Sequence, residues 1–163
     1  MSLPPSNPPP SNLPPLRTLF FEDLSVGMTE TLTKMVSATD VVGFAQLTGD
    51  RNPIHLSEHF AARTTFKKRI AHGLYTASLI SAVLGTRLPG PGAIYISQTL
   101  NFRAPVKIGD TVVVTVTVAD LMAEKSRARL SCVCTVESEI VLDGEALVKV
   151  PKNEKGGRPQ MRL

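Results

Sequence analysis

The residues with the clearest capacity for chemistry lie together, in the stretch Phe44–His55. Within it, Asp50 and His55 supply a carboxylate and an imidazole, with Asn52 and Pro53 between them. Proline fixes its own φ and restrains the residue before it, so we predict a shaped loop between two helices. If this loop folds back on itself, the carboxylate and the imidazole reach one water molecule, which is the geometry of a general acid–base site.

Three other interpretations of this loop compete with the acid–base one. Asp50 and Asn52 are good helix N-cap residues and Pro53 suits a first helical turn, so a plain helix–loop–helix junction explains the composition equally well. A metal site is weaker, because one Asp, one Asn and one His at this spacing match no closed zinc set. A nucleophilic triad is also weak, since no Ser or Cys stands beside a His in a strand–turn–helix elbow.

The segment before the loop must place it, and its pattern predicts a strand followed by a helix. Residues Thr29–Val36 are rich in Thr, Val and Leu, as a strand should be. Ser37 and Asp40 then stand three residues apart and resemble a capping box at a helix start. The apolar and small residues of one buried helical face follow at helical spacing: Val41, Phe44, Ala45 and Thr48.

A longer helix is predicted over Leu74–Leu84, where nearly every residue is apolar or small. A helix that is apolar almost all round is expected to be buried, so we predict that a sheet wraps around this one. Gly73 stands at its N-terminus, where backbone N–H groups lack partners and the helix dipole favours negative charge. Gly73 is therefore either a tight backbone turn or a donor to a developing oxyanion.

The second half of the chain predicts an antiparallel sheet. The four strand candidates are Ala93–Phe102, Thr111–Leu121, Arg127–Glu139 and Glu145–Val150. Asp143 and Gly144 are predicted to form the hairpin turn between the last two. One strand, short helices, a long buried helix and then four strands indicate an α+β protein with its sheet packed on that helix.

Composition limits the possible partners. The chain has 163 residues, 42% of them hydrophobic, a net charge of +4 and 5% aromatic residues. Its basic residues form no long run with interleaved aromatics, so nucleic acid is not expected as a partner. No apolar run is long enough to span a membrane. Cys132 and Cys134 are expected to be buried, unpaired thiols in a reducing, cytoplasmic compartment.

Composition also divides the chain into three parts. Residues 1–18 hold seven of the 13 prolines and are expected to be a disordered tail without the pattern of a targeting signal. Residues 19–151 are expected to form one domain. Residues 152–163 are basic and glycine-containing, and are expected to form a flexible tail.

The motifs resemble those of the MaoC-like, R-specific enoyl-CoA hydratases, the hydratase 2 family. The resemblance rests on GDRNPIH (49–55) behind Phe44, on IAHGLYTASLISAVLG (70–85), on IYISQTLNFRAPVKIGD (94–110) and on GEALVKVP (144–151). It covers the chain from about Phe21 to Pro151, with the motifs in the family's order. It implies a hot-dog fold, in which the sheet wraps the long helix, and a homodimer joined at sheet edges.

The resemblance also implies an activity. This is the reversible hydration of a trans-2-enoyl-CoA to the (R)-3-hydroxyacyl-CoA, without a metal or redox cofactor. Asp50 and His55 would hold and activate the water and handle the two protons, and Asn52 would orient the loop or the water. The Gly73 N–H would stabilise the developing enolate. Which of Asp50 and His55 serves which carbon is left open.

Four further residues are expected to contact the substrate. Ser81 matches a position that lines the family's active site, although a small polar residue bonded to a helix carbonyl is the plainer interpretation. Leu84 would limit the depth of the acyl pocket and so favour short chains. Lys67 and Lys68 either form a solvated basic face or contact the phosphates of coenzyme A.

Two alternative functions remain open. The same residues would serve a dehydratase acting on acyl carrier protein in fatty-acid synthesis. A non-catalytic hot-dog module that binds acyl thioesters is the second, but it has no need of the acid–base pair Asp50 and His55. A thioesterase is less favoured by the GDRNPIH stretch.

Overall fold

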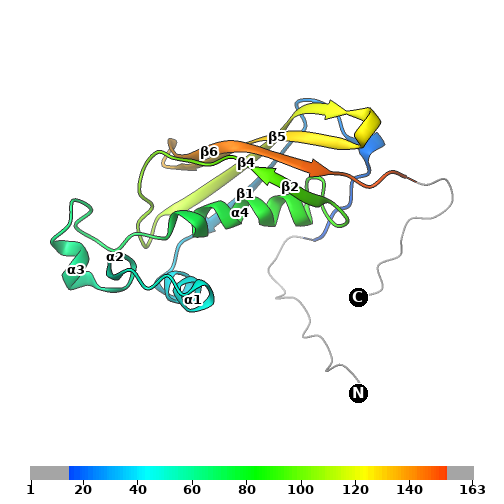
Figure 1. The fold of residues 1–163 in the computed structure, drawn as a ribbon. Coiled ribbons are helices and arrows are strands. Elements are labelled where there is room, and N and C mark those ends of the chain that lie inside the picture. Colours follow the sequence, from blue (N-terminus) through cyan, green and yellow to red (C-terminus); the bar gives the residue numbers. More distant parts are fainter. Residues whose placement is uncertain (1–14, 154–163) are drawn as a thin grey trace, which may run out of the picture.

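A computed structural model describes residues 15–153. The chain forms one antiparallel sheet with a long helix along one face, and three shorter helices gather beyond one end of it (Figure 1). The strands are β1 (Thr29–Met35), β2 (Ile94–Gln98), β3 (Asn101–Phe102), β4 (Thr111–Met122), β5 (Arg127–Val136) and β6 (Glu139–Lys149). The helices are α1 (Ala38–Thr48), α2 (Pro53–Leu56), α3 (Glu58–Ala62) and α4 (Gly73–Thr86). Two 3-10 turns, η1 (Phe21–Asp23) and η2 (Ala123–Lys125), complete the elements.

The sheet is ordered β1-β4-β5-β6-β2, with β3 paired to β6, and every pairing is antiparallel. Its helix-facing side follows the period-two rule of strands. On β4 every second residue from Val112 to Val118 is buried, and β5 contributes Leu130, Cys132 and Cys134 to the same core. Both thiols are free, and burial raises their pKa to about 11 and about 12, so they act as small apolar groups.

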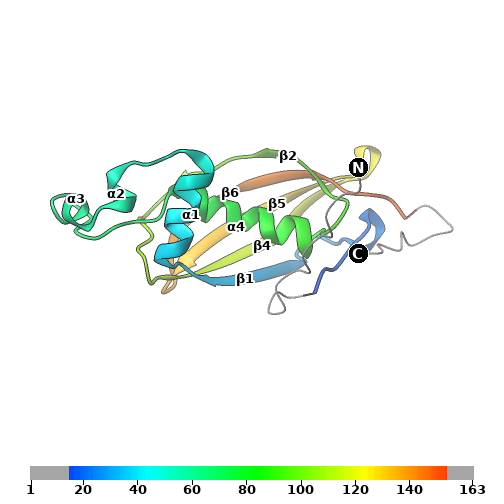
Figure 2. The same ribbon diagram turned by 90° about the horizontal axis from the view of Figure 1, so that it is seen from below.

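Helix α4 crosses this face of the sheet (Figure 2). Ile80, Val83 and Leu84 are almost completely buried against the strands. Away from the sheet, Phe44 of α1 covers Tyr75, but no other described element covers that side of α4, where Leu74 is 61% exposed. The prediction that α4 is buried all round is therefore wrong for a single chain, because the sheet covers only one side of the helix.

The capping box predicted at the start of α1 is confirmed. The Ser37 side chain accepts from the Asp40 N–H, and the Asp40 carboxylate accepts from the Ser37 N–H. These bonds satisfy N–H groups that a helix start leaves free. They fix the entry into α1, whose far end leads into the Asp50 loop.

The last hairpin differs from the prediction. Strand β6 already begins at Glu139, and the turn consists of Glu137 and Ser138, both with positive φ. Gly144 lies inside β6, where a Cβ would come 1.8 Å from the Thr99 carbonyl oxygen. The glycine therefore marks a close backbone approach, not a turn. The predicted strand 93–102 is similarly divided into β2 and β3.

The predicted tails lie mostly outside the described residues. Of residues 1–18, the structure describes 15–18, and these contact the fold. The Arg17 N–H donates to the Thr86 carbonyl at 2.8 Å, and the Arg17 guanidinium pairs with Glu30. Of residues 152–163, it describes the first two, and the Asn153 N–H donates to Glu22. Within residues 15–153 no helix is long and apolar enough to cross a membrane.

Helix α4 should be a main source of stability. Ile80 is fully buried between α4 and the sheet, so Ile80→Ala removes apolar contacts and leaves a cavity. We expect the free energy of unfolding to fall by about 2–5 kcal/mol in urea denaturation. Leu47 on α1 is 85% exposed, and Leu47→Ala, as a control, should change it by less than about 0.5 kcal/mol. Equal effects of the two substitutions would contradict this core.

Candidate active site

The predicted acid–base loop is the connection between α1 and α2. Gly49 ends α1 in the left-handed conformation, with φ of 80°. Asn52 then caps α2, because its side-chain oxygen accepts from the Ile54 N–H at 3.2 Å. The Asn52 N–H in turn donates to the Asp50 carboxylate at 3.1 Å. The loop is thus a helix junction, and the same hydrogen bonds orient the Asp50 carboxylate.

His55, on α2, is turned inward and buried. Its Nδ1 lies 2.8 Å from the Ile70 carbonyl oxygen, which can only accept, so Nδ1 carries a proton. Nε2 has no hydrogen-bond partner among the described residues and is left as the acceptor. Burial lowers the pKa of His55 and outweighs the hydrogen bond to Ile70, so the neutral imidazole is favoured.

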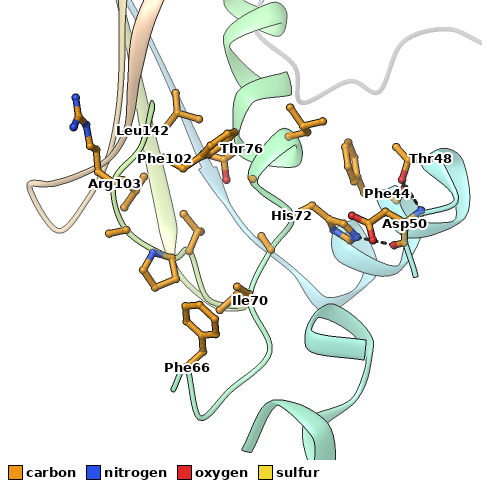
Figure 3. A pocket seen from close by; sticks show the side chains of 17 residues that line it. Phe44, Thr48, Asp50, Phe66, Ile70, His72, Thr76, Phe102, Arg103 and Leu142 are labelled. Carbon is orange, nitrogen blue, oxygen red and sulfur yellow. Dashed lines mark hydrogen bonds between the residues drawn. The ribbon is translucent and has the colours of Figure 1, made fainter. Parts of the chain in front are cut away.

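His72 joins this pair, and the sequence interpretation missed it. Its ring stacks on that of His55, with centroids 3.8 Å apart, and its Nε2 lies 3.0 Å from the Asp50 carbonyl oxygen. Figure 3 shows His72 and Asp50 side by side at one end of the pocket. His72 is only 2% exposed. The signal was available, because a histidine directly before the Gly73 helix start is well placed to face the loop.

These side chains form a poor metal site. One possible ligand atom from each of Asp50, His55 and His72 lies within 4.8 Å of the others. A metal ion must lie close to the plane of each imidazole that binds it, however, and these two rings are stacked with planes only 28° apart. One ion cannot meet both conditions without a ring rotation that breaks a hydrogen bond. The absence of a metal stays a prediction, and this geometry favours it.

The N-terminus of α4 faces the same place. The Gly73 N–H has no hydrogen-bond acceptor among the described residues, so it and the helix dipole are available to a negative charge. A Cβ on Gly73 would lie 2.7 Å from the Phe102 ring. The glycine is therefore required by the close aromatic side chain, which covers the helix end.

A cavity of about 590 Å³ connects these groups. Its polar end is formed by Asp50, His72 and the Gly73 backbone, and the rest is mostly apolar (Figure 3). The apolar wall includes Phe66, Ile70, Phe102, Val106 and Leu142. Such a cavity suits a ligand with an apolar chain and one reactive polar group.

The structure brings some of the predicted residues together and leaves others apart. Asp50 and Gly73 line the cavity, and His55 lies next to its wall, stacked on His72. Ser81 is exposed on α4, Leu84 is in the hydrophobic core, and Lys67 and Lys68 are exposed next to the lining residue Phe66. None of these four lines the cavity of a single chain. Their substrate contacts stay predictions.

Comparison with known proteins identifies the family. Residues 25–140 match the family described as MaoC like domain. The chain is 72% identical over 151 residues to a 3-hydroxybutyryl-CoA dehydratase of Methylorubrum extorquens, covering 93% of this chain and 96% of that protein. It is 53% identical over 132 residues to an (R)-specific enoyl-CoA hydratase of Rhodospirillum rubrum, covering 81% and 92%.

Solved structures agree. The R-hydratase PhaJ1 of Pseudomonas aeruginosa superimposes with a TM-score of 0.81 at 38% identity, covering 91% of this chain and 98% of that one. The chain belongs to the MaoC-like family, and its antiparallel sheet around α4 is the hot-dog fold. The expected α+β hot-dog class is confirmed.

The burial of His55 predicts a pH dependence of stability. Because its pKa is lower in the folded chain than the unfolded value of about 6.5, the unfolded chain binds more protons between these two values. Stability is therefore complete above about pH 6.5 and is lost as pH falls through the lowered pKa. Urea unfolding at a series of pH values should show that the free energy of unfolding falls less steeply with falling pH for His55→Gln than for wild type. His59→Gln, at an exposed position, is the control, and identical slopes for wild type and His55→Gln would contradict the prediction.

The contact between Gly73 and Phe102 predicts a coupled pair. Gly73→Ala forces the Phe102 ring to move and should destabilise the fold by about 1–3 kcal/mol. With Phe102→Ala also present the clash is gone, so the double-mutant cycle should give a clear coupling energy in urea unfolding. Gly85→Ala in the same helix meets nothing within 4 Å, and as a control it should be neutral or stabilising. Additive effects would show that the ring does not lie over Gly73.

Proposed function

We propose that this protein is an R-specific enoyl-CoA hydratase, which adds water reversibly to a trans-2-enoyl-CoA and yields the (R)-3-hydroxyacyl-CoA. The observation that carries the proposal is the polar end of a largely apolar cavity, which Asp50 and Gly73 line and next to which His55 lies. The names of the relatives from Methylorubrum extorquens and Rhodospirillum rubrum support it.

Each of these groups meets one demand of the reaction. Water attacks the β-carbon and gives up a proton, while the α-carbon receives one. The neutral His55 imidazole has a free Nε2 that can accept or return a proton. The Asp50 carboxylate holds and activates the same water molecule together with His55. The structure does not favour either residue, Asp50 or His55, as the group that serves the α-carbon or the β-carbon. Asn52 acts on the loop, by capping α2 and bonding Asp50.

Negative charge builds on the thioester oxygen between these two proton transfers. The free N–H of Gly73, at the positive end of α4, stabilises that enolate, an effect worth about 3 kcal/mol. The Phe102 ring lies beside it, where a Cβ on Gly73 would come within 2.7 Å of the ring. The reaction needs no metal or redox cofactor, which agrees with the stacked rings of His55 and His72.

The carrier and the acyl chain are finer points of this proposal. The dehydratase and hydratase relatives act on coenzyme A thioesters by name, and the exposed Lys67 and Lys68, next to the lining residue Phe66, suit its phosphates. The four-carbon substrate in the name of the Methylorubrum extorquens relative supports short chains. Leu84 gives less support to a preference for short acyl chains, because its side chain lies in the hydrophobic core. The free buried thiols suit a cytoplasmic location.

We also propose that the enzyme is a homodimer joined through β2. This strand ends the sheet, and its Ile94, Tyr95 and Ile96 are 41–59% exposed. An unpaired edge that carries large apolar side chains is an association surface unless something covers it. The uncovered side of α4, with Leu74 and Ser81, also remains to be buried. A second chain would cover both.

Substitutions at β2 test the dimer. Ile94→Lys together with Ile96→Lys places charges on the proposed interface and should convert a two-chain species into single chains in light scattering after gel filtration. Leu47→Lys, which is exposed on α1, should leave the mass unchanged. A wild-type mass of one chain would overturn the proposal.

Activity measurements test the function itself. Wild type should remove the enoyl-thioester absorbance of crotonyl-CoA, with an R-specific dehydrogenase oxidising the product. Asp50→Asn and His55→Gln should each lose about 100-fold or more in kcat, because each removes a proton-transfer group. Asp120→Asn, with a carboxylate half exposed on β4, is the matched control.

The carrier is tested in the same assay. Turnover of the acyl carrier protein thioester alone would favour the dehydratase of fatty-acid synthesis. Preference for octenoyl-CoA over crotonyl-CoA would contradict the short-chain proposal. Wild-type rates in the Asp50→Asn variant would contradict the catalytic role of Asp50. If no thioester were turned over, the non-catalytic module that binds acyl thioesters would be the favoured function.

A further inference from the structure

Among the described residues, His72 contacts Asp50 and His55 and stands at the start of α4, so it touches all three parts of the site described above. It precedes Gly73 and forms the N-cap of α4. Its ring stacks on His55 at 3.8 Å, and its Nε2 lies 3.0 Å from the main-chain oxygen of Asp50. Phe44 of α1 packs against the His72 ring, with ring centroids 5.0 Å apart. The mechanism gives this buried imidazole no role.

The hydrogen bond defines where the His72 proton is. A carbonyl oxygen only accepts, so Nε2 must carry the proton and donate a hydrogen bond to the main-chain oxygen of Asp50. Nδ1 then bears the lone pair, and it is buried without a hydrogen-bond partner among the described residues. His72 therefore lines the cavity, but its one unpaired polar atom, Nδ1, is buried and not accessible to a ligand. It can influence the reaction only through the groups that it holds.

The Asp50 loop has few other ties to the fold. Within the described residues, the other hydrogen bonds of Asp50 run to Thr48 and Asn52, which belong to the same stretch. The bond from His72 is the one that joins Asp50 to the start of α4. It thereby sets the position of the carboxylate relative to the Gly73 N–H. A misplacement of about 1 Å in such a site can cost 100-fold in rate.

We propose that His72 is a positioning residue. Its Nε2–H fixes the main chain of the Asp50 loop against the N-terminus of α4, and its ring holds the imidazole of His55 by stacking. The proposal rests on the proposed hydratase function and extends it to a residue that transfers no proton. It assigns the effect to one N–H group at one ring position.

Two amide substitutions separate this role from simple packing. His72→Gln can place its amide N–H near the former Nε2, whereas the shorter His72→Asn places it near the former Nδ1. With crotonyl-CoA, we expect kcat of the Gln variant within about 5-fold of wild type, and a loss of about 10- to 100-fold for the Asn variant. KM should stay within about 3-fold in both, because no polar contact to the ligand is removed.

Urea unfolding checks that the two variants are equally folded. Equal kcat values for two equally stable variants, whether both high or both low, would overturn the proposal. A rise in KM without a change in kcat would also overturn it, since that would indicate a substrate contact.

A measurement on wild type stands apart from activity. A long-range ¹H–¹⁵N spectrum of the imidazoles distinguishes a ring protonated at Nε2 from one protonated at Nδ1. We expect the Nε2 form for His72 and the Nδ1 form for His55. A His72 ring protonated at Nδ1 would overturn the proposal, even if both amide variants were insoluble. Absence of hydratase activity with the expected tautomers would instead contradict the proposed function alone.

Discussion

The structure depends on the packing of one face of α4 against the antiparallel sheet. Burying Ile80, Val83 and Leu84 fixes the helix axis, and the helix axis fixes the position of Gly73 at its N-terminus. A helix N-terminus is useful to a developing anion only if it stays in place and is kept dry. The sheet supplies the first condition; the second is not met by a single chain, in which Gly73 and the nearby Phe102 of β3 are both exposed.

The second part of the site is held from the other side. The α1–α2 junction and the start of α2 carry Asp50 and His55, the proposed acid–base pair, and short local bonds shape the junction: Gly49 ends α1, and Asn52 caps α2. These bonds alone would not fix the loop relative to α4. Contacts from the chain just before Gly73 do so, because the Ile70 carbonyl accepts from His55 and the His72 ring donates to Asp50. The two halves of the site thus meet across residues 70–73.

Much of this could be predicted from the sequence because local patterns determined it. The capping box at Ser37, the helix predicted at Leu74–Leu84 and observed at Gly73–Thr86, and the helix junction at Asp50–Asn52 all follow from residue types at fixed spacings. The predictions that failed concern residues whose conformation or role is set by contacts with residues distant in the sequence. Asp143 and Gly144 look like a turn, but Asp143 binds Arg103, and Gly144 admits the Thr99 carbonyl. His72 was missed for the same reason, since its partners lie 17 and 22 residues away.

We propose that one acid–base pair, Asp50 and His55, serves both carbons of the double bond from one side. Asp50 and His55 come from one junction, with possible reacting atoms within 4.8 Å of each other. Water and proton should then add to the same face. Hydration of crotonyl-CoA in D₂O, with the coupling between the protons on C2 and C3 of the product read by NMR, tests this directly. We expect syn addition with R configuration at C3, and anti addition would show that one acid–base pair on one face does not serve both carbons.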